Sequence, residues 1–109
     1  MAEALKILGQ EAPAAVTQVD LYTVPAATQS TISTLAVANR ASTATTFRIS
    51  VAAAGAADAV EQYIYYDQFL DGNSSFLVTI GITLSATDVI RVYSANGSVS
   101  FNVFGIEVS

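Results

Sequence analysis

The feature that most constrains the fold of this chain is an alternation of apolar and polar residues with a period of two. The clearest example is the segment "TTFRISVA", in which Phe47, Ile49 and Val51 share one face and Arg48 and Ser50 share the other. This period is typical of a β-strand with one buried face, because successive side chains of a strand point to opposite sides. The segment therefore predicts a strand that lies on a hydrophobic core.

Similar β-prone runs recur along the chain, separated by turn-forming residues. We expect strands within residues 4–9, 15–24, 29–39, 44–53, 60–70, 74–84, 88–94 and 98–108. Eight short strands without an amphipathic helix are typical of a β-sandwich or jelly roll. We therefore predict an all-β fold, a single antiparallel β-sandwich of about eight strands that is jelly-roll-like. Residues 1–109 form one domain in this prediction, with residues 1–13 as an N-terminal arm or first edge strand.

The alanine-rich segment "VAAAGAADAVEQ" is the one place where a helix competes with this interpretation. Alanine has the highest helix propensity, but Gly55 interrupts the segment and no apolar stripe is defined. We predict a flexible loop at the tip of a hairpin, and a short helical turn is the alternative.

The dipeptide Asn96-Gly97 separates the last two predicted strands. Asn-Gly is a strong signal for a two-residue hairpin, because a type I′ turn requires a positive φ at both central residues. We therefore expect the strand within residues 88–94 to pair with the final strand.

The apolar residues of the final strand change face near the end of the chain. Asn102 occupies the polar face, but Phe104, Ile106 and Val108 continue on the same parity, and Gly105 lies at the change. A glycine inside a strand often marks a β-bulge, and a bulge here would return Phe104 to the core. Alternatively, both faces are buried at this end, one against the partner sheet and one against a second subunit.

The charge balance excludes some classes of partner. The chain has four Lys and Arg residues against nine Asp and Glu residues, for a net charge of −5. Without a basic stripe we expect no nucleic-acid partner. No apolar run approaches the roughly 18 residues that cross a bilayer, so we expect no membrane partner. The start "MAEALKILGQEAP" does not have the pattern of a cleaved signal peptide. Charged residues make up only 12% of the chain. A surface with so few charged side chains favours association with other protein molecules.

The residues that carry most enzyme chemistry are scarce. Histidine and cysteine are absent, which removes the commonest general base and the usual thiolate ligands. Asp67 with Asp71 and Asp58 with Glu61 are possible carboxylate pairs, but we interpret them as a turn and a solvated loop. Asp67, Asp71 and Asn73 could offer oxygen ligands to Ca²⁺, yet the alternating pattern of an EF-hand is missing. We predict no catalytic residue, no metal site and no cofactor.

The segment "YIYYDQF" concentrates three of the five tyrosines. Tyrosine combines a large apolar body with a polar tip, so the cluster could pack on both faces, form a protein interface or stack on sugars. Arg40, Arg48 and Arg91 are expected to pair with acids across strands or subunits. The candidate interface residues are Tyr63, Tyr65, Tyr66, Phe69, Phe104, Ile106 and Val108.

Several segments resemble a group of small all-β structural proteins of tailed bacteriophages, over nearly the whole chain. The matching segments are "ILGQEAPAA" (7–15), "LYTVPA" (21–26), "NRASTATTFRISV" (39–51), "YYD" (65–67), "GITLSATDVIRVY" (81–93) and "SFNVFGIEVS" (100–109). These motifs mark strands and turns, so they are more informative about the fold than about the role.

The resemblance implies a virion protein without catalytic residues, made in the host cytoplasm. The role that we expect is a capsid decoration or cement protein on the capsid exterior, which forms homo-oligomers, most often trimers, and bridges neighbouring major capsid subunits. The alternative is a tail, neck or head-fibre accessory that acts as a receptor- or glycan-binding module.

Overall fold

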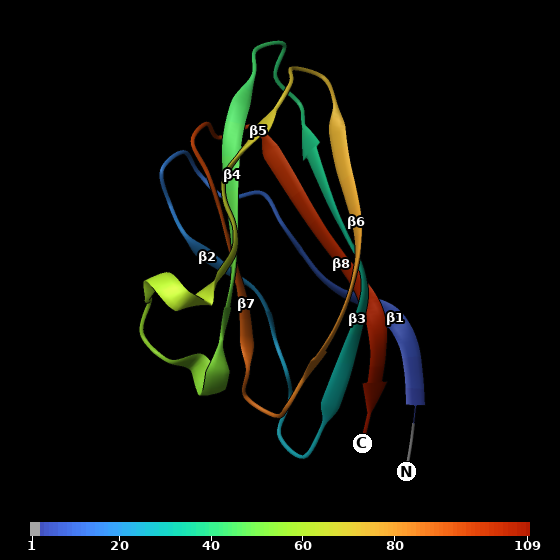
Figure 1. Ribbon diagram of the computed structural model, residues 1–109. Helices are drawn as coiled ribbons and strands as arrows, with labels where there is room; N and C mark the ends of the chain where they lie inside the picture. The colour runs from blue at the N-terminus through green and yellow to red at the C-terminus, as the bar shows by residue number, and fades with distance from the viewer. Residues whose placement is uncertain (1–2) are drawn as a thin grey trace.

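The computed structural model describes residues 3–109 and contains eight β-strands (Figure 1). They are β1 (Glu3–Glu11), β2 (Val19–Thr23), β3 (Gln29–Asn39), β4 (Thr45–Ala52), β5 (Tyr63–Leu70), β6 (Ser75–Leu84), β7 (Val89–Ser94) and β8 (Val99–Val108). Two single-turn 3₁₀ helices, η1 (Ala53–Gly55) and η2 (Val60–Gln62), lie between β4 and β5. Each run predicted from the sequence overlaps one of these strands.

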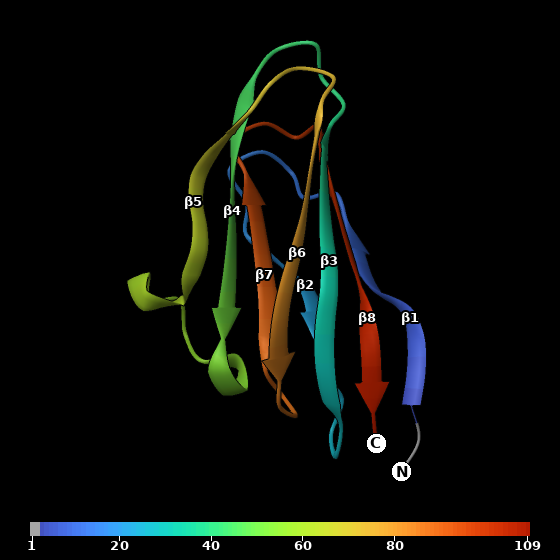
Figure 2. The ribbon, with the colours of Figure 1, turned by 45° about the vertical axis from the view of Figure 1, so that its right-hand side comes forward.

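The strands form two four-stranded antiparallel sheets that face each other (Figure 2). Sheet A has the order β1-β8-β3-β6, and sheet B has the order β2-β7-β4-β5. The first strand thus pairs with the last, β2 with β7, β3 with β6 and β4 with β5. This nested pairing is the arrangement of a jelly roll. The predicted fold class, an antiparallel β-sandwich of eight strands, is confirmed.

The core lies between the sheets and is built from the inward face of each strand. Phe47 on β4 is fully buried and contacts the other sheet, with ring centroids 5.5 Å from Phe76 and 6.1 Å from Phe101. Ile49 is also fully buried, whereas Arg48 between them faces outward. The alternation that predicted this strand therefore also identified its buried face.

The predicted hairpin at Asn96-Gly97 is wrong. β7 pairs with β2 and β4 in sheet B, while β8 pairs with β1 and β3 in sheet A, so residues 95–98 cross from one sheet to the other. Neither Asn96 nor Gly97 has the positive φ that a type I′ turn requires. The crossing is held by backbone hydrogen bonds to other loops and strands, such as Ala95 N–H to the Thr46 carbonyl at 3.0 Å.

The predicted bulge that would return Phe104 to the core is also wrong. Phe104 is 36% exposed on the outer face of sheet A, and Gly105 keeps the inward position. The register shifts lie instead in the two neighbouring strands, between Ile7 and Gly9 of β1 and between Ile32 and Thr34 of β3. Because the bulges lie in β1 and β3 rather than in β8, the apolar residues at the end of β8 remain on the outer face of sheet A.

The alanine-rich segment forms a connection that begins and ends with a 3₁₀ turn. Ala54 has a φ of 53° and Gly55 a φ of 68°, both in the left-handed region. The Asp88 carboxylate accepts a hydrogen bond from the Ala54 N–H at 2.8 Å. The connection thus combines the predicted loop with the short helical turn that was its alternative.

Candidate interaction surfaces

The outer face of sheet B carries an arginine between two tyrosine rings. The guanidinium carbon of Arg48 lies 4.2 Å from the ring centroid of Tyr66 and 4.4 Å from that of Tyr93. Arg48 Nε also donates to Asp67 Oδ1 at 2.7 Å. Cation–π contact and ion pairing hold the guanidinium in place, and its hydrogen bond with Asp67 raises the pKa of Arg48.

An irregularity in β5 explains how one arginine reaches both a ring and a carboxylate of that strand. The pairing of β4 with β5 skips from Gln68 to Tyr65, and Asp67 has a left-handed φ of 51°. Such a bulge brings additional side chains opposite one residue of the partner strand. Tyr66 and Asp67, although consecutive, therefore both meet Arg48.

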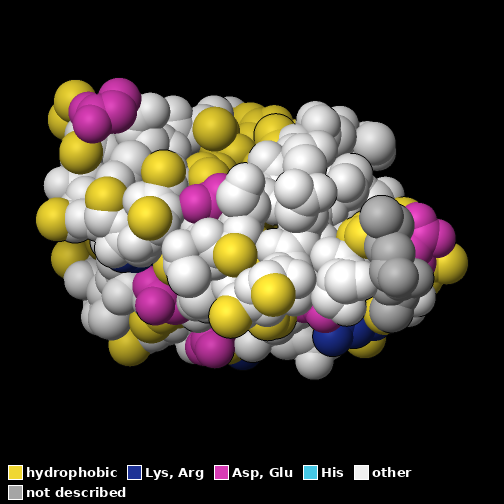
Figure 3. Space-filling view, turned by 90° about the horizontal axis from the view of Figure 1, so that it is seen from below, with side chains coloured by type: hydrophobic (Ala, Val, Ile, Leu, Met, Phe, Trp, Pro, Cys, Tyr) yellow, Lys and Arg dark blue, Asp and Glu magenta, His cyan; other side chains and the backbone are white. Residues whose placement is uncertain are grey.

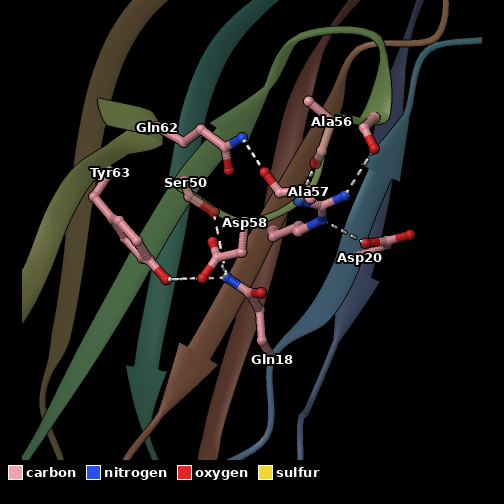
Figure 4. A network of polar contacts seen from close by, with 10 residues as sticks. Gln18, Asp20, Ser50, Ala56, Ala57, Asp58, Gln62 and Tyr63 are labelled. Atoms are coloured by element: carbon pink, nitrogen blue, oxygen red, sulfur yellow. Dashed lines mark hydrogen bonds and ion pairs between the residues drawn. The ribbon is translucent and has the colours of Figure 1, made fainter. Parts of the chain in front are cut away.

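A second polar cluster connects sheet B to the segment between β4 and β5 (Figure 4). The Tyr63 hydroxyl donates to Asp58 Oδ2 at 3.0 Å, and Gln18 Nε2 lies 3.4 Å from Asp58 Oδ1. Burial, followed by the hydrogen bond to Asp58, raises the pKa of Tyr63. Arg91 pairs with Asp20 at 3.2 Å and donates to the Ala56 carbonyl at 2.8 Å. These contacts hold the segment against the sheet.

The structure divides the predicted interface residues among three environments. Tyr63, Tyr66 and Phe69 lie on the outer face of sheet B, with Tyr66 59% and Phe69 60% exposed. Tyr65 packs toward the core, with its ring centroid 5.3 Å from that of Phe76. Phe104, Ile106 and Val108 lie on the outer face of sheet A. The seven residues therefore do not form one surface.

The outer face of sheet A has further apolar residues that sequence reasoning missed. Leu5 and Ile7 of β1 lie opposite Ile106 and Phe104 of β8, and Leu77 lies on β6. Leu5 is 82% and Leu77 66% exposed. The alternation of β6 held a usable signal, because Leu77 falls on the parity opposite to its inward-facing, half-buried neighbours. Figure 3 views the molecule from below and shows acidic side chains at several separate places on an otherwise largely uncharged surface.

The sandwich is less tightly closed where β5 and β6 form the free edges of the two sheets. A groove of about 310 Å³ lies between these edges and is lined by Ile64, Tyr65, Val78, Thr79, Ile80 and Ile82. The inward residues of β6 are consequently only half-buried. The groove is mostly apolar and has no charged residue among those that line it. It therefore presents a surface for packing of apolar groups and no charged side chain for acid–base catalysis.

A polar cluster lies between the sheets near the ends of β1 and β8. The Tyr22 hydroxyl donates to Glu107 Oε2 at 2.6 Å and lies against the Ser30 hydroxyl. Lys6 Nζ lies 2.7 Å from Glu107 Oε1. Hydrogen bonds from Lys6 and then Tyr22 lower the pKa of Glu107. Burial, reinforced by Glu107, raises the pKa of Tyr22 to about 12.

This cluster predicts a loss of stability in acid. Because the folded state lowers the pKa of Glu107, its stabilising contribution is present above the ordinary pKa of about 4.3 and is lost as pH falls through the folded-state pKa. The free energy of unfolding of the parent should exceed that of Glu107→Gln at pH 7, and the two should converge in acid. Lys6→Met keeps the Glu107 carboxylate but removes the ammonium group that does most to lower its pKa. The free energy of unfolding of this variant should therefore depend less on pH than that of the parent. A difference that stays constant from pH 7 to pH 2.5 would contradict the prediction.

Within residues 3–109 no group of three or more His, Cys, Asp or Glu side chains is gathered so that it could hold a metal ion. Asp67, from the segment considered for Ca²⁺, is paired with Arg48 instead. The part of the chain that the structure describes contains no helix long and apolar enough to cross a membrane.

The sequence matches no protein-family model and no curated protein. By structure, the chain is similar to a chain of infectious bursal disease virus strain Gx, with a TM-score of 0.52 and 8% identity over 97% of this chain. The Gt strain of that virus gives a TM-score of 0.50 and 8% identity over 96% of this chain. The chain spans 31% of the length of both viral chains. At this identity the similarity establishes a shared fold.

A pentameric capsid protein isolated from metagenomic phage sequences is similar at a lower TM-score of 0.40, with 19% identity. The match covers 95% of this chain and 63% of that protein.

Proposed function

We propose that this chain is a non-enzymatic structural protein of a bacteriophage virion, and that it decorates or cements the capsid. It forms homo-oligomers, with a trimer favoured, and bridges neighbouring major capsid subunits from the capsid exterior. The sequence resemblance to small all-β phage proteins supports this role, and the jelly-roll fold is compatible with it.

The observation that carries the proposal is the presence of large exposed residues on both outer faces of a sandwich whose interior is already filled. Tyr66 and Phe69 are exposed on sheet B, and Leu5, Leu77 and Phe104 on sheet A. Exposed apolar groups that gather on one face are typical of interaction sites, and tyrosine and arginine are enriched at protein interfaces. Two such faces on opposite sides suit a protein that contacts two neighbours at once.

Antibody labelling of intact particles of the virus that encodes this chain, viewed by electron microscopy, tests the role. We expect label over the whole head, because a decoration protein binds at every equivalent position of the shell. Label at one vertex or along the tail would replace decoration by the accessory role, in which the exposed tyrosines of sheet B bind a receptor or glycan. Particles without any label would contradict a virion role.

A further inference from the structure

The outer face of sheet A is almost without charge. The residues of β1, β3, β6 and β8 on this face are Glu3, Leu5, Ile7, Gln10, Gln29, Thr31, Ser33, Thr34, Ala36, Ala38, Ser75, Leu77, Thr79, Gly81, Thr83, Ser100, Asn102, Phe104, Ile106 and Val108. Among them only Glu3, opposite Val108 at one corner, is charged. In a chain of net charge −5, this face is where two molecules can meet with the least repulsion.

The apolar residues of this face are adjacent rather than scattered. Leu5 lies opposite Ile106, and Ile7 opposite Phe104, on neighbouring strands. Side chains directly opposite each other on antiparallel strands lie about 5 Å apart, so these four form one continuous patch. The core on the other side of the sheet is filled by its own residues, so covering this patch requires a second molecule.

The charge distribution indicates which molecule covers it. On the sheet B side Asp20 is paired with Arg91 and Asp67 with Arg48, and two further acids, Asp58 and Glu61, lie in the adjoining segment between β4 and β5. The sheet B side therefore carries charges of both signs with an excess of acid, which suit a charged or polar partner, whereas the outer face of sheet A has almost no charge to pair. An uncharged face lets identical copies approach without placing like charges together.

The size of the face is adequate for such a contact. β3 has 11 residues and β6 and β8 have 10 each. With a rise of about 3.3 Å per residue and about 4.8 Å between strands, the four strands cover roughly 600 Å² in projection. The accessible area of the side chains exceeds this projection, so the face approaches the roughly 800 Å² that each partner buries in a standard interface.

We propose that copies of this chain associate through the outer face of sheet A, with Leu5, Ile7, Phe104 and Ile106 at the centre of the contact. This inference rests on the proposed function, in which the chain forms homo-oligomers, and it assigns the contact between the copies to one of the two outer faces. The sheet B face, with its Arg48–Tyr66–Tyr93 stack, is then left free for the other partner.

Sedimentation equilibrium of the purified protein tests this inference with a matched pair of variants. Phe104→Asp places a carboxylate in the proposed contact, whereas Phe69→Asp makes the same change on the outer face of sheet B. Because a buried unpaired charge is costly, we expect Phe104→Asp to raise the dissociation constant at least about 100-fold. Phe69→Asp should leave it within about threefold.

A second pair of variants avoids substitutions in a central strand, where a change could impair folding. Leu5 on the edge strand β1 is 82% exposed, and Val60 in η2 is 87% exposed, so neither substitution by Asp disturbs the core. Leu5→Asp should weaken association and Val60→Asp should not. A parent protein that stays monomeric up to about 1 mM, or association weakened only by Phe69→Asp, would overturn the inference.

The experiment separates this inference from the proposed function. A monomeric protein that still binds particles, and loses that binding in Leu5→Asp, would retain the virion role but assign the sheet A face to the shell. Self-association through this face without any particle label would retain the inference and contradict the virion role.

Discussion

Gly105→Ala is expected to lower the free energy of unfolding by about 3 kcal/mol, near the upper end of the usual cost of overpacking. A Cβ at this position would lie 2.2 Å from the Thr31 carbonyl oxygen and 3.2 Å from the Ile32 Cα. Both atoms belong to the backbone of β3, which is held between β8 and β6. β3 cannot withdraw without losing its pairing on one side, so the clash has no inexpensive relief.

Urea denaturation of the purified protein measures this effect, with Gly97→Ala as the control. Gly97 lies in the connection between the sheets, and its nearest neighbour to a new Cβ would be the Ala15 nitrogen at 3.4 Å. We expect a change of less than about 1 kcal/mol for this control. Equal stability of the two variants would contradict the close approach of β8 to β3. That approach matters for the proposed contact, because it holds Phe104 and Ile106 on the outer face.

The fold class could be predicted because the strands carry their burial pattern in the sequence. Phe47 and Ile49 face the core and Arg48 faces outward, as the period of two predicts for a strand with one buried face. The absence of a helical stripe then left only all-β arrangements. This information is local, and the short strands of a sandwich supply it repeatedly.

The pairing of strands could not be predicted in the same way, because it is set by contacts far apart in sequence. Asn96-Gly97 joins consecutive strands that lie in different sheets. A tight turn has similar local chemistry whether it closes a hairpin or crosses a sandwich. β8 pairs instead with β3 and with β1, which lies at the other end of the chain, and no local turn signal predicts either pairing.

The candidate surfaces were predicted in part, for a related reason. The aromatic run left core packing and an interface both open, and only the structure shows Tyr66 and Phe69 exposed. Alternation places Tyr66 and Asp67 on opposite faces. The left-handed φ of Asp67 breaks the alternation and brings both to Arg48. A bulge that depends on one backbone angle leaves little trace in composition, whereas the outward parity of Leu77 was already present in the sequence.

Phe47→Ala is expected to have the largest effect on stability, about 3–5 kcal/mol. Phe47 is fully buried, and its ring contacts Phe76 and Phe101 of sheet A as well as Tyr65 of sheet B. Truncation leaves a cavity between the sheets, and the surrounding backbone is fixed by ladder hydrogen bonds, so the cavity closes only in part.

The matched control is Phe69→Ala, which removes the same atoms from a ring that is 60% exposed on β5. We expect a loss of less than about 1 kcal/mol for this variant, since little buried area is removed. Denaturant midpoints and slopes of both proteins give the comparison, and an unchanged slope shows that the unfolded state is unaltered. If Phe47→Ala cost no more than Phe69→Ala, Phe47 could not be the residue that joins the two sheets. If it costs several times more and the transitions followed by different probes coincide, sheets A and B unfold as one unit, so a partner bound to either outer face stabilises the other sheet as well.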